Sequence, residues 1–398
     1  MDIYPAAAEY LRSVPVDQPV IGIRPHAASR AAKWFVSRFP GETLYAVKAN
    51  DSPLILQTLV EAGIRHFDVA SLPEVRAAAA LPGVTMHVMH PVKSPRFIAE
   101  AYHDFGVRTF ALDSEAELAK IEAATGGAKD LTLIVRVACP STYSEISLEG
   151  KFGAPWSEAP GLIRRARQKA DTLGITFHAG SQMMCPVGYG QVLRTVSQHI
   201  VRAATLVDII DVGGGFPSRY PGMEPPALDA YMDEIDAAFD RMAVGYACQL
   251  WCEPGRALVA EAESVIVRVE ARRGDTLYIN DGAFGTLYDA AHCKWVFPAR
   301  AYSATGETLD ERSVKPFGLY GPTCDSADFL PGPFMLPDCA GEGDYIEIGN
   351  IGAYGRVMAG HFNGYGYYGE IILGDEPMLS MYADDTAQHA KQAFAAAF

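Results

Sequence analysis

Short apolar segments recur along the first two thirds of the chain, and the stretches between them show a helical spacing of apolar residues. Segments of this kind predict buried strands. Their ranges are 44–48, 66–70, 85–89, 109–112, 132–137, 175–179, 209–212 and 249–252. Helices are expected between them, among others at 53–62, 74–81, 94–105, 114–124 and 157–173. Strands that alternate with helices form parallel sheets, and this number of strands favours a (β/α)8 barrel.

The pattern changes after Arg256. Residues 263–270 alternate between apolar and polar, segments 276–280 and 344–348 are short and rich in β-formers, and proline and glycine interrupt the whole region. These features predict a second, mostly antiparallel β domain.

Two further helices are expected outside this scheme, at 27–39 before the first strand and in the Ala-rich tail 384–398. Within the barrel, Ser114 and Glu117 have the spacing of a capping box, which marks a helix start.

Composition narrows the class of protein. The 398 residues are 49% hydrophobic, which suits about two folded domains, and the net charge of −15 argues against nucleic acid or an anionic membrane as partner. The seven cysteines include no CxxC pair, so we expect them to be reduced, as in the cytoplasm. The start of the chain lacks the basic and apolar blocks of a secretion signal, and no apolar run is long enough to span a bilayer.

Several predicted strands end in polar residues, where a barrel carries its chemistry. These residues are Lys48, Asp68, His90, Asp113, Arg136, His178, Asp211 and Glu253. Lys48 follows four apolar or aromatic residues. Its ammonium could reach water or pair with a carboxylate, or it could be a desolvated amine that reacts with an aldehyde.

Three consecutive glycines, Gly213, Gly214 and Gly215, follow the strand that ends at Asp211. Their backbone N–H groups can form a nest for a phosphate, although a glycine run also serves as a simple turn. The spacing matches neither GxxxxGK[ST] nor GxGxxG, so neither a nucleoside triphosphate nor a dinucleotide is favoured.

Three other residues are candidates for the same site. Glu253 could pair with Arg256 or hold the proton of a pyridine nitrogen, and His178 could be a core residue or stack on a planar ring. Cys324, between Thr323 and Asp325, could donate a proton while Asp325 binds an amine, or it could be a small buried residue at a turn. A lysine, a flat ring, a phosphate nest and a carboxylate together describe a site for pyridoxal phosphate.

Six motifs then stand in the order found in one known family: YAVKAN, HAGSQ, DVGGGFP, EPGR, GPTCDSAD and IGAYG. In these the chain resembles the fold-type III pyridoxal-phosphate decarboxylases, the ornithine/diaminopimelate/arginine decarboxylase group, from about residue 20 to about residue 375. The resemblance implies a (β/α)8 barrel at 25–258 that binds the cofactor. It also implies a C-terminal β-barrel domain, here 259–398 with 1–24, and a head-to-tail homodimer with active sites at the interface.

Carried over residue by residue, the resemblance implies that Lys48 bonds to the cofactor aldehyde, that His178 stacks on its ring and that Glu253 holds its nitrogen. The residues implied around the phosphate are Ser181, Gly213, Gly214, Gly215, Gly255, Arg256 and Tyr354. Asp68 and Arg136 match positions that line the site near the lysine.

For the substrate, the resemblance implies that the other subunit supplies Cys324 as proton donor and Asp325 with Asp289 as partners of the distal amine. Tyr288 and Phe362 would line the same pocket. Diaminopimelate enzymes usually carry Glu at the position of Asp325 and use arginines for a second carboxylate, and no arginine lies between Asp275 and Tyr288.

We therefore expect decarboxylation of L-ornithine to putrescine, with L-lysine to cadaverine as a second reaction, in polyamine biosynthesis. Diaminopimelate or carboxynorspermidine decarboxylation, a non-catalytic homologue that binds a partner, and a racemase on the same barrel remain as alternatives. A racemase would need a catalytic tyrosine from the β domain, where the GPTCD segment favours decarboxylation instead.

Overall fold

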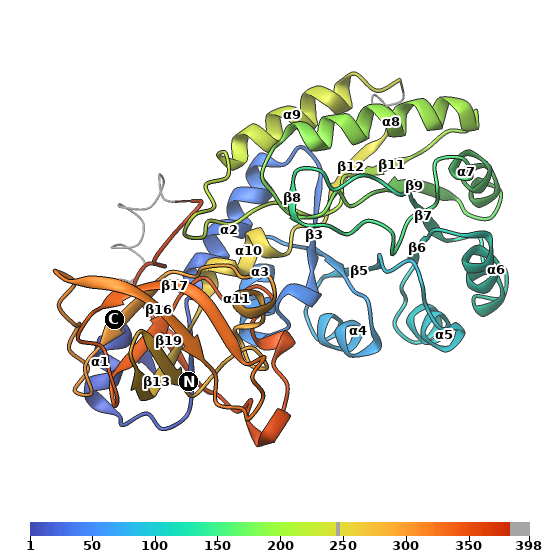
Figure 1. Cartoon of the computed structure of the whole chain (residues 1–398). Coiled ribbons are helices and arrows are strands. Elements are labelled where there is room, and N and C mark those ends of the chain that lie inside the picture. Colours follow the sequence, from blue (N-terminus) through green and yellow to red (C-terminus); the bar gives the residue numbers. More distant parts are fainter. Residues whose placement is uncertain (244–246, 383–398) are drawn as a thin grey trace. The chain divides into compact units, whose positions relative to one another are not determined.

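The computed structural model describes residues 1–243 and 247–382, and the chain forms two compact units (Figure 1). The barrel unit comprises Ala32–Pro217 and Pro225–Ala257. The β unit comprises Met1–Ala31, Ser218–Glu224 and the described chain from Leu258 onward. None of the described helices is both long and apolar enough to cross a bilayer.

The barrel unit is built on a closed barrel of parallel strands, as the sequence predicts. Its strands, in order around the barrel, are β3 (Glu42–Ala46), β4 (His66–Asp68), β5 (Thr85–Val88), β6 (Thr109–Leu112), β7 (Thr132–Arg136), β9 (Thr172–Thr176), β11 (Ile209–Asp211) and β12 (Gln249–Cys252). The last strand closes on the first, with Trp251 paired to Glu42. All the carboxyl ends of these strands therefore face the same side of the barrel.

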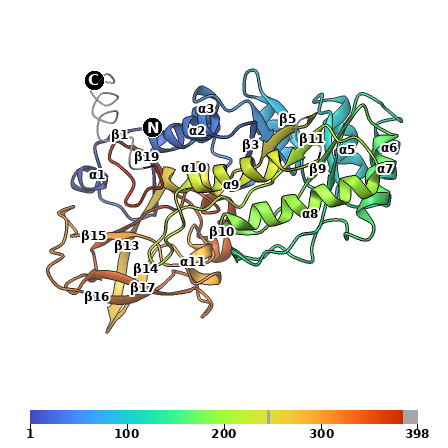
Figure 2. The ribbon, with the colours of Figure 1, turned by 90° about the horizontal axis from the view of Figure 1, so that it is seen from above.

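Helices alternate with these strands, and α4 to α7 lie on the outside of the barrel (Figure 1). The longer helices are α2 (Pro25–Arg38), α3 (Pro53–Glu61), α4 (Leu72–Ala79), α5 (Pro95–His103), α6 (Glu115–Ala124), α7 (Ala159–Arg167), α8 (Val187–Ala203) and α9 (Leu228–Asp240). Helices α8 and α9 lie side by side (Figure 2). Half of the predicted capping box is present, because Ser114 Oγ accepts the Glu117 N–H at 3.3 Å, while the Glu117 carboxylate accepts the N–H of Lys93 at 3.1 Å.

Three predicted boundaries are wrong. Strand β9 is Thr172–Thr176 rather than 175–179, and the helix predicted to reach residue 173 ends at Arg167. The apolar residues at this junction belong to the strand, and periodicity alone cannot separate a helix end from a strand start. Lys48 does not end a strand, because β3 stops at Ala46 and the 3-10 turn η1 (Val47–Ala49) carries the lysine.

The barrel interior is filled by side chains. One buried layer consists of Leu44, Met89, Ala111, Ile134, Ile209 and Trp251, which come from six different strands or strand ends. Nearer the start of the strands, the His66 and His87 rings lie 2.9 Å apart between their nitrogens, and His87 also lies 3.0 Å from Thr109 Oγ1. The barrel interior is therefore a packed core, and the loops at its carboxyl end are where a barrel of this kind is expected to carry a site.

The β unit contains a mixed sheet of nine described strands, confirming a second domain of mostly antiparallel sheet. They are β1 (Ile3–Tyr4), β2 (Val20–Ile23), β13 (Glu263–Arg273), β14 (Thr276–Ile279), β15 (Ala299–Tyr302), β16 (Val314–Tyr320), β17 (Phe329–Pro337), β18 (Tyr345–Ile348) and β19 (Gly369–Leu373). Strand β13 pairs with β2, β14 and β18, all antiparallel. Its first five residues are all buried rather than alternately exposed, because Glu263 and Ser264 are hydrogen-bonded to arginines.

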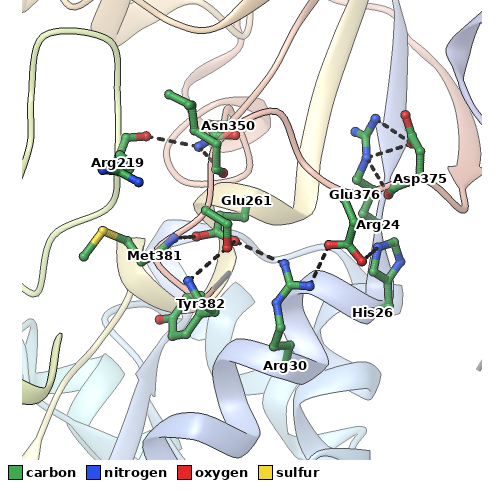
Figure 3. Close-up of polar contacts among 12 residues, drawn as sticks. Arg24, His26, Arg30, Arg219, Glu261, Asn350, Asp375, Glu376, Met381 and Tyr382 are labelled. Carbon is green, nitrogen blue, oxygen red and sulfur yellow. Dashed lines mark hydrogen bonds and ion pairs between the residues drawn. The ribbon is translucent and has the colours of Figure 1, made fainter. Parts of the chain in front are cut away.

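Buried ion pairs hold the segment that follows β19 (Figure 3). Arg24 pairs with Asp375 and Glu347 at 2.8 Å each. Glu261 accepts hydrogen bonds from Ser380 Oγ and the Met381 N–H, both at 2.6 Å, and pairs with Arg30 at 3.4 Å. The predicted tail helix at 384–398 lies outside the described residues.

Candidate active site

Lys48 lies at the carboxyl end of the barrel, on the turn that follows β3. Its Nζ is 3.2 Å from Oδ2 of Asp68, which ends the neighbouring strand β4 and is 3% exposed. The lysine side chain is 43% exposed. Of the two interpretations left open by the sequence, the structure thus shows the carboxylate-paired amine, which sits in a position that a small aldehyde can reach from solvent.

The glycine loop after β11 is held rigidly rather than forming a loose turn. Gly213 has a φ of 68°. Its N–H donates to Asp211 Oδ1 at 2.8 Å, and its carbonyl oxygen accepts the N–H of Glu253 at 2.8 Å. A Cβ on Gly214 would lie 2.6 Å from the carbonyl oxygen of Glu253, and one on Gly215 would lie 2.3 Å from the carbonyl oxygen of Gly180. Only glycine fits at these positions, because neighbouring backbone comes too close.

Two donors in this loop remain available. Within residues 1–243 and 247–382, the N–H groups of Gly214 and Gly215 donate to no protein acceptor. Gly214 is buried and Gly215 is partly buried, and two adjacent open donors at a strand end offer hydrogen bonds to water or to a ligand. A phosphate oxygen is the acceptor that such a nest prefers.

His178 stands beside this loop, two residues after β9. Its Nε2 is 3.0 Å from the position that a Cβ on Gly214 would take, and its Nδ1 is buried without a partner in the described chain. Burial, helped by the charges of Arg136 and Lys48, lowers the pKa of the imidazole well below its usual value, so the ring is neutral. A neutral, flat ring held against a glycine suits stacking on an aromatic ligand.

Glu253 and Asp211 form a pair of buried carboxyl groups at the ends of adjacent strands. Burial, the Asp211 charge and the Asp68 charge raise the pKa of Glu253 well above its usual value, and burial also raises the pKa of Asp211. Two such groups hold a proton between them unless a cation is placed beside them. A protonated ring nitrogen would supply that cation, so the pair fits a pyridine ring.

The other predicted barrel residues lie on the same loops. Ser181 starts the short strand β10 (Ser181–Met183), which pairs with β8 (Ser144–Ile146). Gly255 and Arg256 are buried just after β12, and the carbonyl of Pro254 accepts the N–H of Ala46 next to the Lys48 turn. Arg136 ends β7, with its guanidinium 5.4 Å from the ring of Phe152. The sequence did not single out Phe152, which also meets His90 at 5.2 Å.

The remaining predicted residues belong to the β unit. Asp289 is 8% exposed on the short helix α11 (Tyr288–His292), where Tyr288 stacks on His292 at 4.0 Å. Tyr354 has a left-handed backbone, with a φ of 60°. These residues lie on separate segments from the Cys324 loop, residues 321–328.

Cys324, Asp325 and Phe362 are brought together by a residue that the sequence did not indicate. Cys324 and Asp325 are exposed on the Cys324 loop, and Phe362, 47% exposed, packs against Phe284 at 5.0 Å. The Cys324 N–H donates to Oδ1 of Asn363 at 3.1 Å, which joins the two loops. An Asn-Gly pair is a turn signal, and it was the available sequence clue to this position.

Comparison with known proteins agrees with this geometry. Residues 26–260 match the family model described as pyridoxal-dependent decarboxylase, pyridoxal binding domain. A lysine/ornithine decarboxylase from Selenomonas ruminantium is 32% identical over 343 residues, which is 84% of each chain. Antizyme inhibitor 2 from Xenopus laevis is 28% identical over 81% of this chain and 73% of that protein.

Among solved structures, lysine decarboxylase from Selenomonas ruminantium superposes with a TM-score of 0.79 at 27% sequence identity, covering 97% of both chains. The family model thus spans more than half of the chain, and it covers the lysine turn, the glycine loop and the Glu253 carboxyl described above. The protein therefore belongs to the fold-type III pyridoxal-dependent decarboxylases, a family of enzymes whose cofactor is pyridoxal phosphate.

Proposed function

We propose that the protein decarboxylates a basic L-amino acid, with L-ornithine as the principal substrate and L-lysine as a second one. The products are putrescine and cadaverine, which places the reaction in polyamine biosynthesis. One observation carries the choice of substrate: the β unit offers two carboxylates, Asp289 and Asp325, and no arginine lies between Asp275 and Tyr288. Two acidic groups suit a terminal ammonium and disfavour a second substrate carboxylate.

The barrel residues are assigned to the cofactor. Pyridoxal phosphate, when bound, supplies an aldehyde that takes up an amine and a ring that accepts the electron pair left by departing CO₂. Lys48 is the amine that would hold the aldehyde, and Asp68 would orient that amine. Glu253, with Asp211 beside it, would keep the ring nitrogen protonated, and the neutral His178 ring would stack on the cofactor ring.

The phosphate is assigned to the nest and its neighbours. The open N–H groups of Gly214 and Gly215 support this assignment most directly. The further groups proposed here are Ser181, Gly255, Arg256 and Tyr354, and Gly213, whose own N–H is donated to Asp211, shapes the loop that carries the two open donors. Arg136 is proposed to line the site near Lys48, and its positive charge contributes to lowering the pKa of the His178 imidazole.

The β unit is assigned to the substrate and to protonation. Cys324 donates a proton to the substrate Cα after CO₂ has left, and its exposed thiol is accessible to a ligand. Asp325 and Asp289 bind the distal ammonium, and Tyr288 and Phe362 line the pocket for the aliphatic chain. We place these residues in the active site of a second copy, so that the working unit is a homodimer with sites at its interface.

This assignment gives each domain a role. The barrel, residues 25–258, binds the cofactor, and the β domain, residues 1–24 and 259–398, completes the partner's site. All seven cysteines are free in the structure, which agrees with the reducing cytoplasm as the compartment that we propose.

CO₂ release from L-ornithine, L-lysine, L-arginine, meso-diaminopimelate and carboxynorspermidine tests the substrate. We expect kcat/KM to be highest for L-ornithine, followed by L-lysine. A preference for meso-diaminopimelate or carboxynorspermidine would overturn the assignment of Asp289 and Asp325 to a terminal ammonium.

A second candidate function is a non-catalytic homologue that binds a partner protein, and the similarity to antizyme inhibitor 2 is the observation that favours it. Retention of Lys48, Cys324 and Asp325 favours the enzyme. An absorbance scan of the purified protein, after incubation with pyridoxal phosphate and removal of unbound cofactor, separates the two, because a lysine-bound cofactor stays with the protein and absorbs near the visible edge. A racemase is disfavoured by the same Cys324 loop, and chiral analysis of the recovered substrate tests it.

A further inference from the structure

The backbone of Cys324 is held by a side chain from another loop. Asn363 Oδ1 accepts the Cys324 N–H at 3.1 Å, and the two residues are 39 positions apart in the sequence. Asn363 belongs to the Phe362 loop, which we define as residues 360–364. A bond of this kind fixes the position of the Cα of Cys324 and therefore the arc that its thiol can reach.

Asn363 adopts an unusual backbone conformation to make this bond. Its φ is 54°, in the left-handed region that asparagine tolerates better than other side chains apart from glycine. The turn is closed by Gly364, whose N–H donates to the carbonyl of His361 at 3.1 Å. The left-handed turn presents the amide oxygen toward the Cys324 loop.

Both loops are anchored to a third, the central loop, residues 281–285. The Gly360 N–H donates to the Phe284 carbonyl at 2.9 Å, and the rings of Phe284 and Phe362 pack at 5.0 Å. The N–H of Ala283, in the central loop, donates to the Asp328 carboxylate at 2.7 Å. Residues of all three loops line one small cavity.

Asp328 also fixes the Cys324 loop from inside. Its carboxylate accepts the N–H of Thr323 at 3.0 Å and the hydroxyl of Thr323 at 2.7 Å, and it is 1% exposed. A Cβ on Gly282 or Gly321 would lie 2.1 or 2.2 Å from an Asp328 oxygen, so glycine at both positions makes room for the carboxylate. The loop therefore has a buried anchor at Thr323, and Asn363 is the anchor for the next residue, Cys324.

We propose that Asn363 is a positioning residue for decarboxylation, whose amide oxygen fixes the Cys324 backbone and so aims the thiol that donates the proton. This inference rests on the proposed function of Cys324. Asp328 holds the loop as a whole, whereas Asn363 sets the one residue that transfers the proton. Loss of Asn363 is expected to slow turnover while leaving the binding of the substrate ammonium by Asp325 nearly unchanged.

The test uses the cofactor-loaded full chain and two variants. Asn363→Gly keeps the left-handed turn without strain but removes the acceptor, whereas Asn363→Asp keeps both an acceptor and tolerance of the turn. Residue-resolved amide hydrogen exchange reports the bond directly. We expect Asn363→Gly to accelerate exchange at the Cys324 amide threefold or more and to leave the Thr323 amide unchanged, while Asn363→Asp keeps both close to the parent rate.

Steady-state kinetics with L-ornithine give the second readout. We expect Asn363→Gly to lower kcat tenfold or more with KM changed less than twofold, and Asn363→Asp to restore most of kcat. Faster exchange at both Thr323 and Cys324 would show that the loop has simply unfolded, and unchanged kcat in Asn363→Gly would show that the bond does not position the thiol. Either result overturns the proposal. Absence of decarboxylation by the parent protein would instead overturn the proposed function, and hydrogen exchange would still report the bond.

Discussion

The ammonium of Lys48, on the turn after β3, lies 3.2 Å from the carboxylate of Asp68, which ends the neighbouring strand β4. This pairing orients the Lys48 amine, and a defined orientation favours a covalent link to an aldehyde. We expect Lys48→Ala to abolish both the near-visible absorbance of bound cofactor and CO₂ release. Absorbance titration with pyridoxal phosphate measures the first effect, and near-normal turnover by the variant would exclude Lys48 from the mechanism.

Asp68→Asn tests the orienting partner separately. The asparagine retains the size and one acceptor but loses the charge that faces the ammonium, and such charge-assisted bonds contribute about 1.5–3 kcal/mol when shielded. Because the Lys48 side chain is 43% exposed, we expect the loss of free energy to be smaller than this. The variant should show a weaker absorbance band than the parent at the same cofactor concentration. An Asp68→Asn protein that binds cofactor like the parent would remove Asp68 from its orienting role.

Gly214 gives a prediction about the cofactor alone. A Cβ at this position would lie 2.6 Å from the Glu253 carbonyl and 3.0 Å from His178 Nε2, so alanine must displace the loop that offers the two open N–H groups. We expect Gly214→Ala to weaken pyridoxal-phosphate binding by about tenfold or more, which corresponds to about 1.4 kcal/mol. Gly341→Ala is the matched control, because its nearest contact would be 3.8 Å away and its φ is not left-handed. Equal cofactor affinity in the two variants would contradict the nest.

The barrel and the positions of polar residues at its carboxyl end were largely predictable, because each rests on a local pattern. Alternating apolar segments specify strands, and polar residues directly after them specify one end of the barrel. Contacts between segments that are far apart in the sequence could not be predicted. Asn363 contacts Cys324 from 39 residues away, and Glu117, predicted to complete a helix cap, instead accepts the N–H of Lys93.

The shift at β9 has a similar origin. Leu173 and Ile175 are both buried and apolar, so a helix that ends and a strand that starts share one hydrophobic run. Only the register with β7 and β11 decides between them, since it pairs Ile175 with Val135 and Ile210. Lys48 was misplaced for the opposite reason, because the strand-like run continues through Val47 while the backbone turns after Ala46.

His87 predicts how stability depends on pH. It is buried inside the barrel beside His66, and burial together with the His66 charge lowers its pKa from 6.5 to about 3. The folded state therefore excludes a proton that the unfolded state binds, so stability is full above pH 6.5 and falls as the pH drops toward 3. The expected slope is about 1.4 kcal/mol per pH unit for this group alone.

The comparison variant is His87→Asn, which keeps a polar side chain for Thr109 but cannot be protonated. Urea unfolding of both proteins at a series of pH values between 7 and 4 gives the midpoints. We expect the urea concentration at the unfolding midpoint to fall further for the parent than for the variant as the pH is lowered, whatever the difference between the two proteins at pH 7. If the midpoints of the two proteins fell in parallel over the whole pH range, protonation of His87 would not be a cause of the loss of stability in acid.

Glu261 predicts what holds the segment after β19. Its carboxylate is 4% exposed, accepts two hydrogen bonds of 2.6 Å from Ser380 and Met381, and pairs with Arg30 (Figure 3). Removing one partner of a buried ion pair leaves the other without compensation and typically costs about 3–5 kcal/mol. We expect Glu261→Ala to destabilise the protein by an amount of that order. Faster amide exchange at Met381 should accompany the loss, because the acceptor of that N–H has been removed.

The exposed pair between Arg12 and Glu307 provides the control for this prediction. Glu307 is 67% exposed, and an exposed pair contributes only about 0–1 kcal/mol. Glu307→Ala should therefore leave the urea midpoint and the exchange rate of the Met381 amide nearly unchanged. If Glu261→Ala lowered stability without affecting Met381, the carboxylate would be acting through Arg30 alone. If neither variant changed anything, the ion pair would not be what keeps residues 375–382 in place.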